Sequence, residues 1–285
     1  METTNSSLKS EIFVPPVNQT LVKVLADFIK EELGRFGIKK AVVGLSGGID
    51  SSVVAYLAVE ALGKKNVFGL ILPYKTSSKS SMSDAFLIAK KLRIKTKIID
   101  ITPAADGLIN SISDRKINNV RIGNILARLR MISLYDYSSK VGGLVLGTGN
   151  KTEILLGYTT LFGDAAYAVN PIGDLYKTQV WQLAELLKIP KSIIKKKPSA
   201  DLWIGQTDEK ELGFTYREAD KLLYYLIDCH YTDKELKAQG YKPEFIKRVK
   251  SIIRRNQFKR VPPLIAKVSN RTINIDFRYN RDWGS

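Results

Sequence analysis

Cysteine and histidine are almost absent from this chain of 285 residues. Cys229 is the single cysteine, which excludes an intramolecular disulfide, a Cys-x-x-Cys redox motif and a thiolate zinc cluster. The single histidine, His230, directly follows it. Adjacent residues of a helix point in different directions, so we do not expect these two side chains to form a catalytic dyad. Both are expected to be structural.

Long apolar runs and acidic residues are also scarce. No apolar run reaches bilayer-spanning length, and Met1–Ser10 lacks the hydrophobic core of a signal peptide, so we expect a cytoplasmic protein with no membrane partner. The 45 Lys and Arg against 28 Asp and Glu give a net charge of +17. This balance fits an anionic partner, nucleotide or nucleic acid, and it equally fits a solvated lysine-rich surface.

Short apolar segments alternate with amphipathic ones, as in a doubly wound α/β sheet with helices on both faces. We expect strands at Ala41–Leu45, Val67–Leu72, Lys97–Ile101 and Leu144–Leu146. The expected helices are Asn18–Arg35, Asp50–Leu62, Ser83–Leu92 and Asn119–Lys140. Such sheets bind ligands at the carboxyl ends of their strands, where Ser46, Pro73 and Thr148 fall.

One of these strands leads directly into a Ser-Gly-Gly turn and a helix. The segment comprises Gly44, Leu45, Ser46, Gly47, Gly48, Ile49, Asp50 and Ser51. Adjacent glycines let backbone N–H groups approach anionic oxygens, and the helix N-terminus adds positive potential. Ser46 and Ser51 can donate hydrogen bonds, while Asp50 can hold a Mg²⁺ ion that bridges phosphate oxygens. An ordinary glycine turn is the alternative, but strand, turn, acid and helix together favour an ATP-phosphate site.

This turn lacks the Gly-Lys-Ser/Thr ending of the common NTPase loop. It resembles the pyrophosphatase loop of N-type ATP pyrophosphatases, which cleave ATP between the α and β phosphates. A second glycine turn, Gly147-Thr148-Gly149, leaves the strand Leu144–Leu146 and places Glu153 in the first turn of a helix. That carboxylate can simply favour the helix dipole. Paired with Asp50, it would instead give Mg²⁺ two oxygen ligands.

Several further segments make the chain similar to the NAD synthetase family, over roughly Asn18–Trp283. They are Gly147–Glu153, Asn170–Lys177, Lys197–Leu202 and the tail Lys259-Arg260 with Pro262-Pro263. The resemblance implies one domain over 1–285, with 1–17 as an N-terminal extension and 257–285 as a C-terminal tail. It also implies a mainly parallel five-stranded sheet of the adenine nucleotide alpha hydrolase-like fold.

The resemblance implies site residues as well. The ATP contacts would come from Gly44–Ser51 with Thr148, Lys177 and Ser199, and the Mg²⁺ ligands would be Asp50 and Glu153. Catalytic roles fall on Asp50, Lys177 and Asp164. The positions that contact the dinucleotide in the family are occupied here by Arg128, Leu161, Ala168, Phe258 and Lys259.

Three of these positions depart from the family pattern. Leu161 stands where ammonia-dependent members commonly have lysine, Ala168 replaces an aspartate, and Phe258 replaces the histidine of a His-Lys pair. Each change removes a polar contact to the dinucleotide. The Leu161 and Phe258 variants look like the synthetase half of glutamine-dependent enzymes, so a different binding pose is the expected consequence.

The implied reaction is amidation of deamido-NAD. ATP adenylates the nicotinate carboxylate, and ammonia then displaces AMP to give NAD. The chain has no room for an amidohydrolase, so ammonia is expected to be used directly or to be delivered by a separate protein. Two loops, Tyr74–Ser81 and Pro198–Gly213, are candidate lids over the nucleotide, with plain surface loops as the alternative.

Two other functions are compatible with the turn alone. A tRNA-modifying ATP pyrophosphatase would require catalytic cysteines or an RNA-binding appendage, which we do not find. A non-enzymatic nucleotide-binding module would have no need for Asp50, Glu153 and Lys177 together. We therefore expect small-molecule substrates and no nucleic acid partner. The resemblance implies a homodimer, with Asn119–Lys140 as an interface element.

Overall fold

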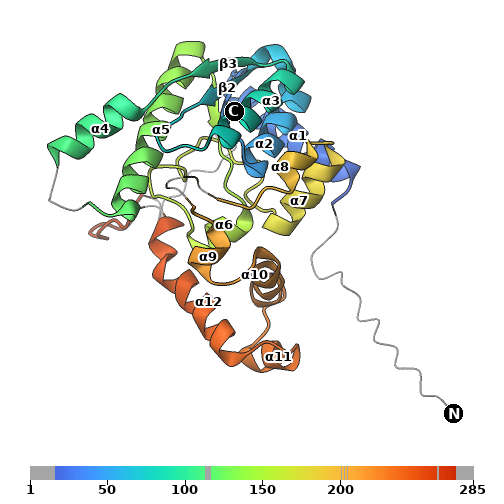
Figure 1. Ribbon diagram of the computed structural model, residues 1–285. Helices are drawn as coiled ribbons and strands as arrows, with labels where there is room; N and C mark the ends of the chain where they lie inside the picture. Colours follow the sequence, from blue (N-terminus) through green and yellow to red (C-terminus); the bar gives the residue numbers. More distant parts are fainter. Residues whose placement is uncertain are drawn as a thin grey trace.

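A parallel sheet between two layers of helices forms the larger part of the protein (Figure 1). The computed structural model describes residues 17–112, 117–199, 201, 203, 205–261 and 263–273. Most of the expected N-terminal extension and the C-terminal tail from residue 274 therefore lie outside the described residues, as do Ala200, Leu202 and Pro262.

The sheet has the strand order β3-β2-β1-β4, and every pair of neighbours is parallel. Its strands are β1 (Ala41–Gly44), β2 (Val67–Ile71), β3 (Lys95–Ile98) and β4 (Leu144–Leu146). The strand order reverses between β1 and β4. Connections leave a sheet in opposite directions at such a point, and a crevice opens at the carboxyl ends of the two strands. The two glycine turns of the sequence begin there.

The prediction of five strands is wrong for the described residues, which form four. The fifth position is taken by a single parallel bridge between Leu146 and Val169. The Gly147 N–H donates to the Val169 carbonyl at 2.8 Å. Asn170-Pro171 follow directly, and proline has no N–H to extend a ladder. The segment therefore lies beside β4 without becoming a strand.

One face of the sheet is covered by α1 (Gln19–Arg35), α2 (Ile49–Leu62), α3 (Lys79–Leu92), α7 (Lys177–Leu186) and the short α8 (Lys191–Ile194). Their buried side chains pack with Ala41 and Val43 of β1 into one apolar core. The opposite face is covered by α4 (Thr102–Ser111) and α5 (Asn119–Val141), which pack on Val42 and Leu70. Helices on both faces confirm the doubly wound α/β class.

A group of helices packs below the sheet layers in Figure 1 around a core of its own. It contains α6 (Lys151–Leu156), α9 (Asp208–Leu212), α10 (Tyr216–Leu223), α11 (Asp233–Ala238), α12 (Pro243–Arg255) and the short segments Tyr224–Asp228 and Gln257–Lys259. Leu156 of α6 and Tyr216 of α10 are buried in this core. The crevice therefore has a floor from the sheet and a wall from these helices.

Most element boundaries agree with the sequence within a turn, and two differ. α3 begins at Lys79, because the Ser78 side chain caps it by accepting from Ser81 N, so the first candidate lid is shorter than expected. β3 begins at Lys95 and not at Lys97, and it ends at Ile98. Beyond its end, the N–H groups of Ile99 and Ile101 still donate to the carbonyls of Ile71 and Pro73. No described helix is long and apolar enough to cross a bilayer.

Candidate active site

A cavity of about 660 Å³ opens at the carboxyl ends of β1 and β4. The Ser-Gly-Gly turn lines one part of it, and Thr148, Glu153 and Lys177 line another. Of the residues that the sequence assigns to ATP, all except Gly47 line the cavity. Asp164 and Lys259 line it as well. Tertiary structure thus brings together segments that lie more than a hundred residues apart.

The Ser-Gly-Gly turn is held in shape by its own hydroxyl groups. Ser46 Oγ and Ser51 Oγ are 3.0 Å apart, and Ser46 Oγ accepts from Gly48 N at 3.2 Å. Gly47 has a φ of +76°, and a Cβ there would lie 2.0 Å from the Ser81 carbonyl oxygen. Only glycine fits, because both the left-handed backbone and the close approach of α3 exclude a side chain.

Lys177 joins the two carboxylates that the sequence assigns to Mg²⁺. Its Nζ donates to Asp50 Oδ2 at 2.6 Å and to Glu153 Oε1 at 3.3 Å. The Lys177 side chain is 2% exposed, against 18% for Asp50 and 15% for Glu153. The three residues come from the first turns of α7, α2 and α6, so three helix N-termini meet at one point.

Asn150 completes this arrangement, and sequence reasoning gave it no role. Its Nδ2 donates to Asp50 Oδ1 at 3.0 Å, while its Oδ1 accepts from Glu153 N at 3.0 Å. The Asn150 N–H in turn donates to Glu153 Oε2, which makes a capping box at the start of α6. The spacing Asn-x-x-Glu was the available signal. Asn150 therefore orients both carboxylates.

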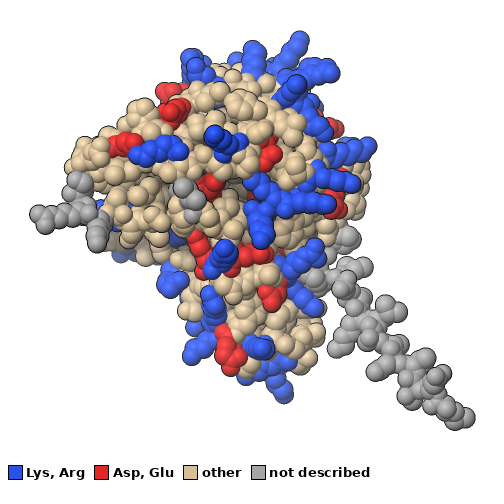
Figure 2. Space-filling model, in the orientation of Figure 1, with Lys and Arg blue, Asp and Glu red and all other residues tan. Residues whose placement is uncertain are grey.

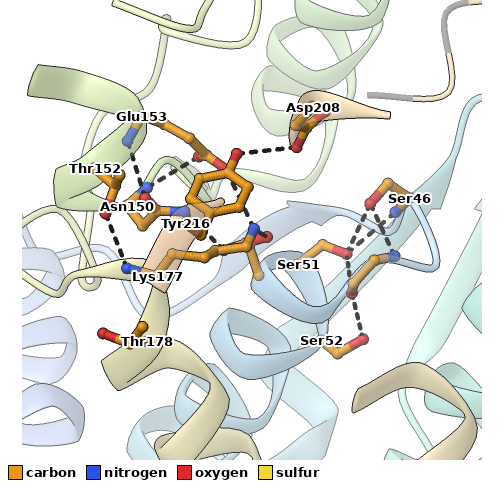
Figure 3. Close-up of polar contacts among 12 residues, drawn as sticks. Ser46, Ser51, Ser52, Asn150, Thr152, Glu153, Lys177, Thr178, Asp208 and Tyr216 are labelled. Atoms are coloured by element: carbon orange, nitrogen blue, oxygen red, sulfur yellow. Dashed lines mark hydrogen bonds and ion pairs between the residues drawn. The ribbon is translucent and has the colours of Figure 1, made fainter. Parts of the chain in front are cut away.

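Asp208 and Tyr216 also lie near Lys177, and sequence reasoning gave neither residue a role, although Asp208 falls within the candidate lid loop Pro198–Gly213. The Tyr216 hydroxyl donates to Asp208 Oδ2 at 3.0 Å, and the Lys177 ammonium lies 5.2 Å from the Tyr216 ring centre. Figure 3 shows the ring beside the Lys177 side chain, with its hydroxyl directed toward Asp208. Asp208 is 4% exposed, and its Oδ1 has no hydrogen-bond partner.

Burial and mutual repulsion shift the protonation of these groups. Burial raises the pKa of Glu153 to about 8; the Lys177 charge opposes this rise, and Asp50 and Asp208 add to it. Burial lowers the pKa of Lys177, but the carboxylates of Asp50 and Glu153 outweigh burial, so the net shift is upward. Burial likewise raises the pKa of Asp208. Lys177 therefore stays positively charged, and the carboxyl groups around it outnumber the positive charges that could neutralise them.

The chemistry of this donor set fits Mg²⁺. Ionised Asp50, Glu153 and Asp208 would leave two uncompensated negative charges around Lys177, and a buried excess of charge is costly. A divalent cation would cancel that excess. No group of three or more His, Cys, Asp or Glu side chains in the described part of the chain is arranged as a metal site. Two carboxylates with substrate phosphates are, however, the usual environment of Mg²⁺.

Asp164 lies on the cavity wall, where its Oδ1 accepts from Thr160 N at 2.8 Å. The residue is accessible from the cavity, yet surrounding protein raises the pKa of its carboxyl through burial. Arg130, which sequence reasoning missed, lines the same cavity and donates from Nε to the Leu72 carbonyl at 3.2 Å. Asp164 and Arg130 lie close enough to interact electrostatically.

The residues assigned to the dinucleotide are more scattered. Lys259 lines the cavity and donates to the carbonyls of Gly157 and Thr159 at 2.7 and 2.6 Å. Arg128 is exposed and donates to the Leu161 carbonyl at 3.2 Å. Ala168 and Phe258 are exposed and do not line the cavity. The structure therefore gathers the ATP and metal residues more tightly than the dinucleotide residues.

The two candidate lid loops contact each other across the cavity. Ser78 N donates to Asp201 Oδ2 at 3.1 Å. Lys196 Nζ, just before the second loop, bonds Ser81 Oγ at 3.0 Å and Asp84 Oδ2 at 2.9 Å. Figure 2 shows Lys and Arg scattered over most of this face, with acidic atoms gathered where the sheet layers meet helices α9 to α12. The cavity thus combines acidic side chains with the Ser-Gly-Gly turn.

The model of the NAD synthase family matches residues 21–263. The chain belongs to the NAD synthase family. A relative from Trichlorobacter lovleyi, named NH(3)-dependent NAD(+) synthetase, is 54% identical over 94% of this chain and 98% of its own length. One of the same name from Fusobacterium nucleatum is 50% identical over 86% of this chain and 94% of its own. NAD synthases are ligases that form a C–N bond, so the chain is an ATP-binding enzyme of that class.

Two solved structures are similar throughout. The NH3-dependent NAD synthetase of Campylobacter jejuni, in complex with nitrate, has a TM-score of 0.74 and 36% identity, covering 87% of this chain and 98% of that one. NMN synthetase from Francisella tularensis has a TM-score of 0.78 and 34% identity over the same shares. The family membership confirms the resemblance that the sequence motifs indicated.

Proposed function

We propose that this chain amidates the nicotinate carboxylate of deamido-NAD with free ammonia, in the cytoplasm. ATP is consumed, and AMP and pyrophosphate are released. The observation that carries this proposal is the Lys177 ammonium held between Asp50 and Glu153 beside the Ser-Gly-Gly turn. Relatives named NH(3)-dependent NAD(+) synthetase, about half identical over most of the chain, support it.

The first half-reaction joins a nicotinate oxygen to the α-phosphorus and breaks its bond to the bridging oxygen of pyrophosphate. The Gly44–Ser51 turn, with the hydroxyl groups of Ser46 and Ser51 at the N-terminus of α2, binds the departing phosphates. Lys177 stabilises the charge that develops on them, and Thr148 and Ser199 hold the rest of ATP. Asp50 and Glu153 would hold Mg²⁺, which supplies further charge neutralisation at the phosphate oxygens. No side-chain nucleophile is needed, which agrees with the scarcity of cysteine and histidine.

In the second half-reaction the ammonia lone pair forms the C–N bond, one N–H proton is lost, and AMP leaves. Asp164 would orient ammonia or the acyl centre, and Lys259 and Arg128 would contact the dinucleotide. The contacts between the two lid loops support exclusion of water from the adenylate. Water in the site would otherwise hydrolyse the adenylate.

A homodimer belongs to the same proposal. Leu108 and Ile112 at α4, with Val120, Ile132 and Tyr135 on α5, are between 37% and 62% exposed. A second copy would bury this apolar face, which fits the interface role expected for the α5 segment.

Product analysis tests the proposal directly. Purified protein is incubated with ATP, Mg²⁺, ammonium chloride and deamido-NAD, and the products are quantified. We expect NAD, AMP and pyrophosphate to form in equal amounts. Omission of ammonium should stop NAD formation, and glutamine should not restore it. Nicotinate mononucleotide replaces deamido-NAD in a parallel reaction, because Leu161, Ala168 and Phe258 alter the dinucleotide positions. Faster turnover of the mononucleotide, or no AMP from any mixture, would contradict the proposal.

A further inference from the structure

Asp208 is a buried carboxylate near Lys177 that the proposed reaction leaves without a task. It begins α9, far from the phosphate loop in sequence, and its backbone N–H donates to the Pro198 carbonyl at 3.2 Å. The Tyr216 hydroxyl fixes Oδ2 at 3.0 Å. Its Oδ1 is buried without a hydrogen-bond partner. A buried carboxylate oxygen without a hydrogen-bond partner costs free energy, and a nearby cation can offset that cost.

Lys177 is a cation whose charge acts on the Asp208 carboxylate. An ammonium has three N–H donors, and two of them are directed at Asp50 Oδ2 and Glu153 Oε1. Asp208 lies within electrostatic range of Lys177 and stabilises its charge. Tyr216 links the two groups, because its ring faces the ammonium and its hydroxyl bonds the carboxylate (Figure 3).

Lys177 and Mg²⁺ would compete for the same two carboxylates. Lys177 now makes its two hydrogen bonds to the residues assigned to the metal, so metal binding must weaken those bonds. A displaced ammonium without a new partner would be a buried unpaired charge, which is strongly destabilising. Among the described residues, Asp208 Oδ1 is a buried acceptor near Lys177 that makes no hydrogen bond.

We propose that Asp208 is a positioning residue for Lys177, and that Asp208 Oδ1 accepts the Lys177 ammonium when Asp50 and Glu153 take up Mg²⁺. This inference rests on the metal assignment of the proposed function. Lys177 then stays charged at the cavity wall, facing the phosphates, while both metal ligands are released to the ion. Asp208 acts through Lys177 and touches neither substrate nor metal.

A double-mutant cycle on metal binding tests this coupling. Binding of Mn²⁺, as a paramagnetic substitute for Mg²⁺, is measured by electron paramagnetic resonance with α,β-methylene ATP present. The variants are Asp208→Asn, Lys177→Met and the combination. We expect Asp208→Asn to raise the Kd of Mn²⁺ by about tenfold when Lys177 is present, and by less than about twofold when it is methionine, since coupled pairs show such non-additivity. Equal changes in both backgrounds would mean a simple loss of charge and would overturn the inference.

Asp201→Asn is the matched control. Asp201 lines the same cavity, but its Oδ2 accepts from Ser78 N at 3.1 Å. Its effect on Mn²⁺ binding should be the same with lysine or methionine at 177. If Asp208→Asn does not fold, Tyr216→Phe, which frees Oδ2, should raise the Kd in the lysine background only. Mn²⁺ binding that does not depend on Asp50 would instead refute the metal assignment itself.

Discussion

Lys177 shows how one side chain obtains its properties from residues distant in sequence. It is 2% exposed, and it remains charged because Asp50 and Glu153 outweigh the effect of burial on its pKa. Asn150 holds those two carboxylates in place through hydrogen bonds to both residues. At the scale of single residues the site is therefore an electrostatic unit, in which each charge depends on the others.

Removal of either proposed metal ligand is expected to lower turnover by about 10²-fold or more. Asp50→Asn and Glu153→Gln keep the shape of the side chain but remove the charge that Mg²⁺ requires, and a metal contributes several kcal/mol to stabilisation of such a transition state. Steady-state NAD formation at saturating Mg²⁺ measures the effect. Near-normal turnover in either variant would contradict the metal assignment.

The stability of the nucleotide-free protein should depend on the charge of Glu153. Burial raises its pKa from 4.5 to about 8 in the folded state. Between these values the folded protein retains a proton that the unfolded chain has lost, so the free energy of unfolding falls as pH rises from about 4.5 to about 8. Urea unfolding in EDTA across this range should show a smaller fall for Glu153→Gln. Glu31→Gln, on the exposed side of α1, should keep the wild-type slope.

At the scale of single elements, the proposed phosphate site is built from the ends of helices. α2, α6 and α7 each begin at the crevice, and α3 approaches so closely that Gly47 touches Ser81. The strand, turn and helix around the Ser-Gly-Gly segment were predictable because their signals are local. The absence of a fifth strand from the described residues was not predictable, because it depends on the path that the chain takes after Val169 beside β4.

Gly47→Ala should destabilise the protein by about 2–5 kcal/mol, since backbone strain and steric overlap add. The new Cβ would lie 2.0 Å from the Ser81 oxygen at a φ of +76°. Gly142→Ala is the control, because Gly142 also has a positive φ, +63°, but nothing lies within 4 Å of its Cβ position. It should cost only about 1–2 kcal/mol. Urea unfolding of both variants distinguishes the close contact from backbone strain alone.

The whole molecule separates its tasks between two cores. The sheet and its helices carry the residues proposed to bind ATP, and the helices around the second core supply Asp208 and Tyr216. Helices α4 and α5, which carry the exposed apolar side chains of the proposed interface, lie on the side of the sheet away from α1 and α2 (Figure 1). This division leaves that face free for a second copy of the chain.

Ile132→Asp should shift the protein from dimer to monomer. Ile132 is 56% exposed on α5, and a carboxylate there would have to be desolvated in the interface. Light scattering coupled to size-exclusion chromatography measures the mass. Phe36→Asp, at the 71% exposed end of α1, should leave the mass unchanged. A wild-type protein of monomeric mass would refute the dimer.

The sequence by itself determined the layers, the order of the elements and the two glycine turns that we propose bind phosphate. These features follow from local causes: hydrophobic period, glycine pairs and helix-capping residues act within a few positions. Only the tertiary structure decided that Asn150 and Lys177 join Asp50 to Glu153, and that Asp208 and Tyr216 stand beside them. Contacts between residues about a hundred positions apart depend on how whole helices pack, and no short sequence pattern encodes that packing.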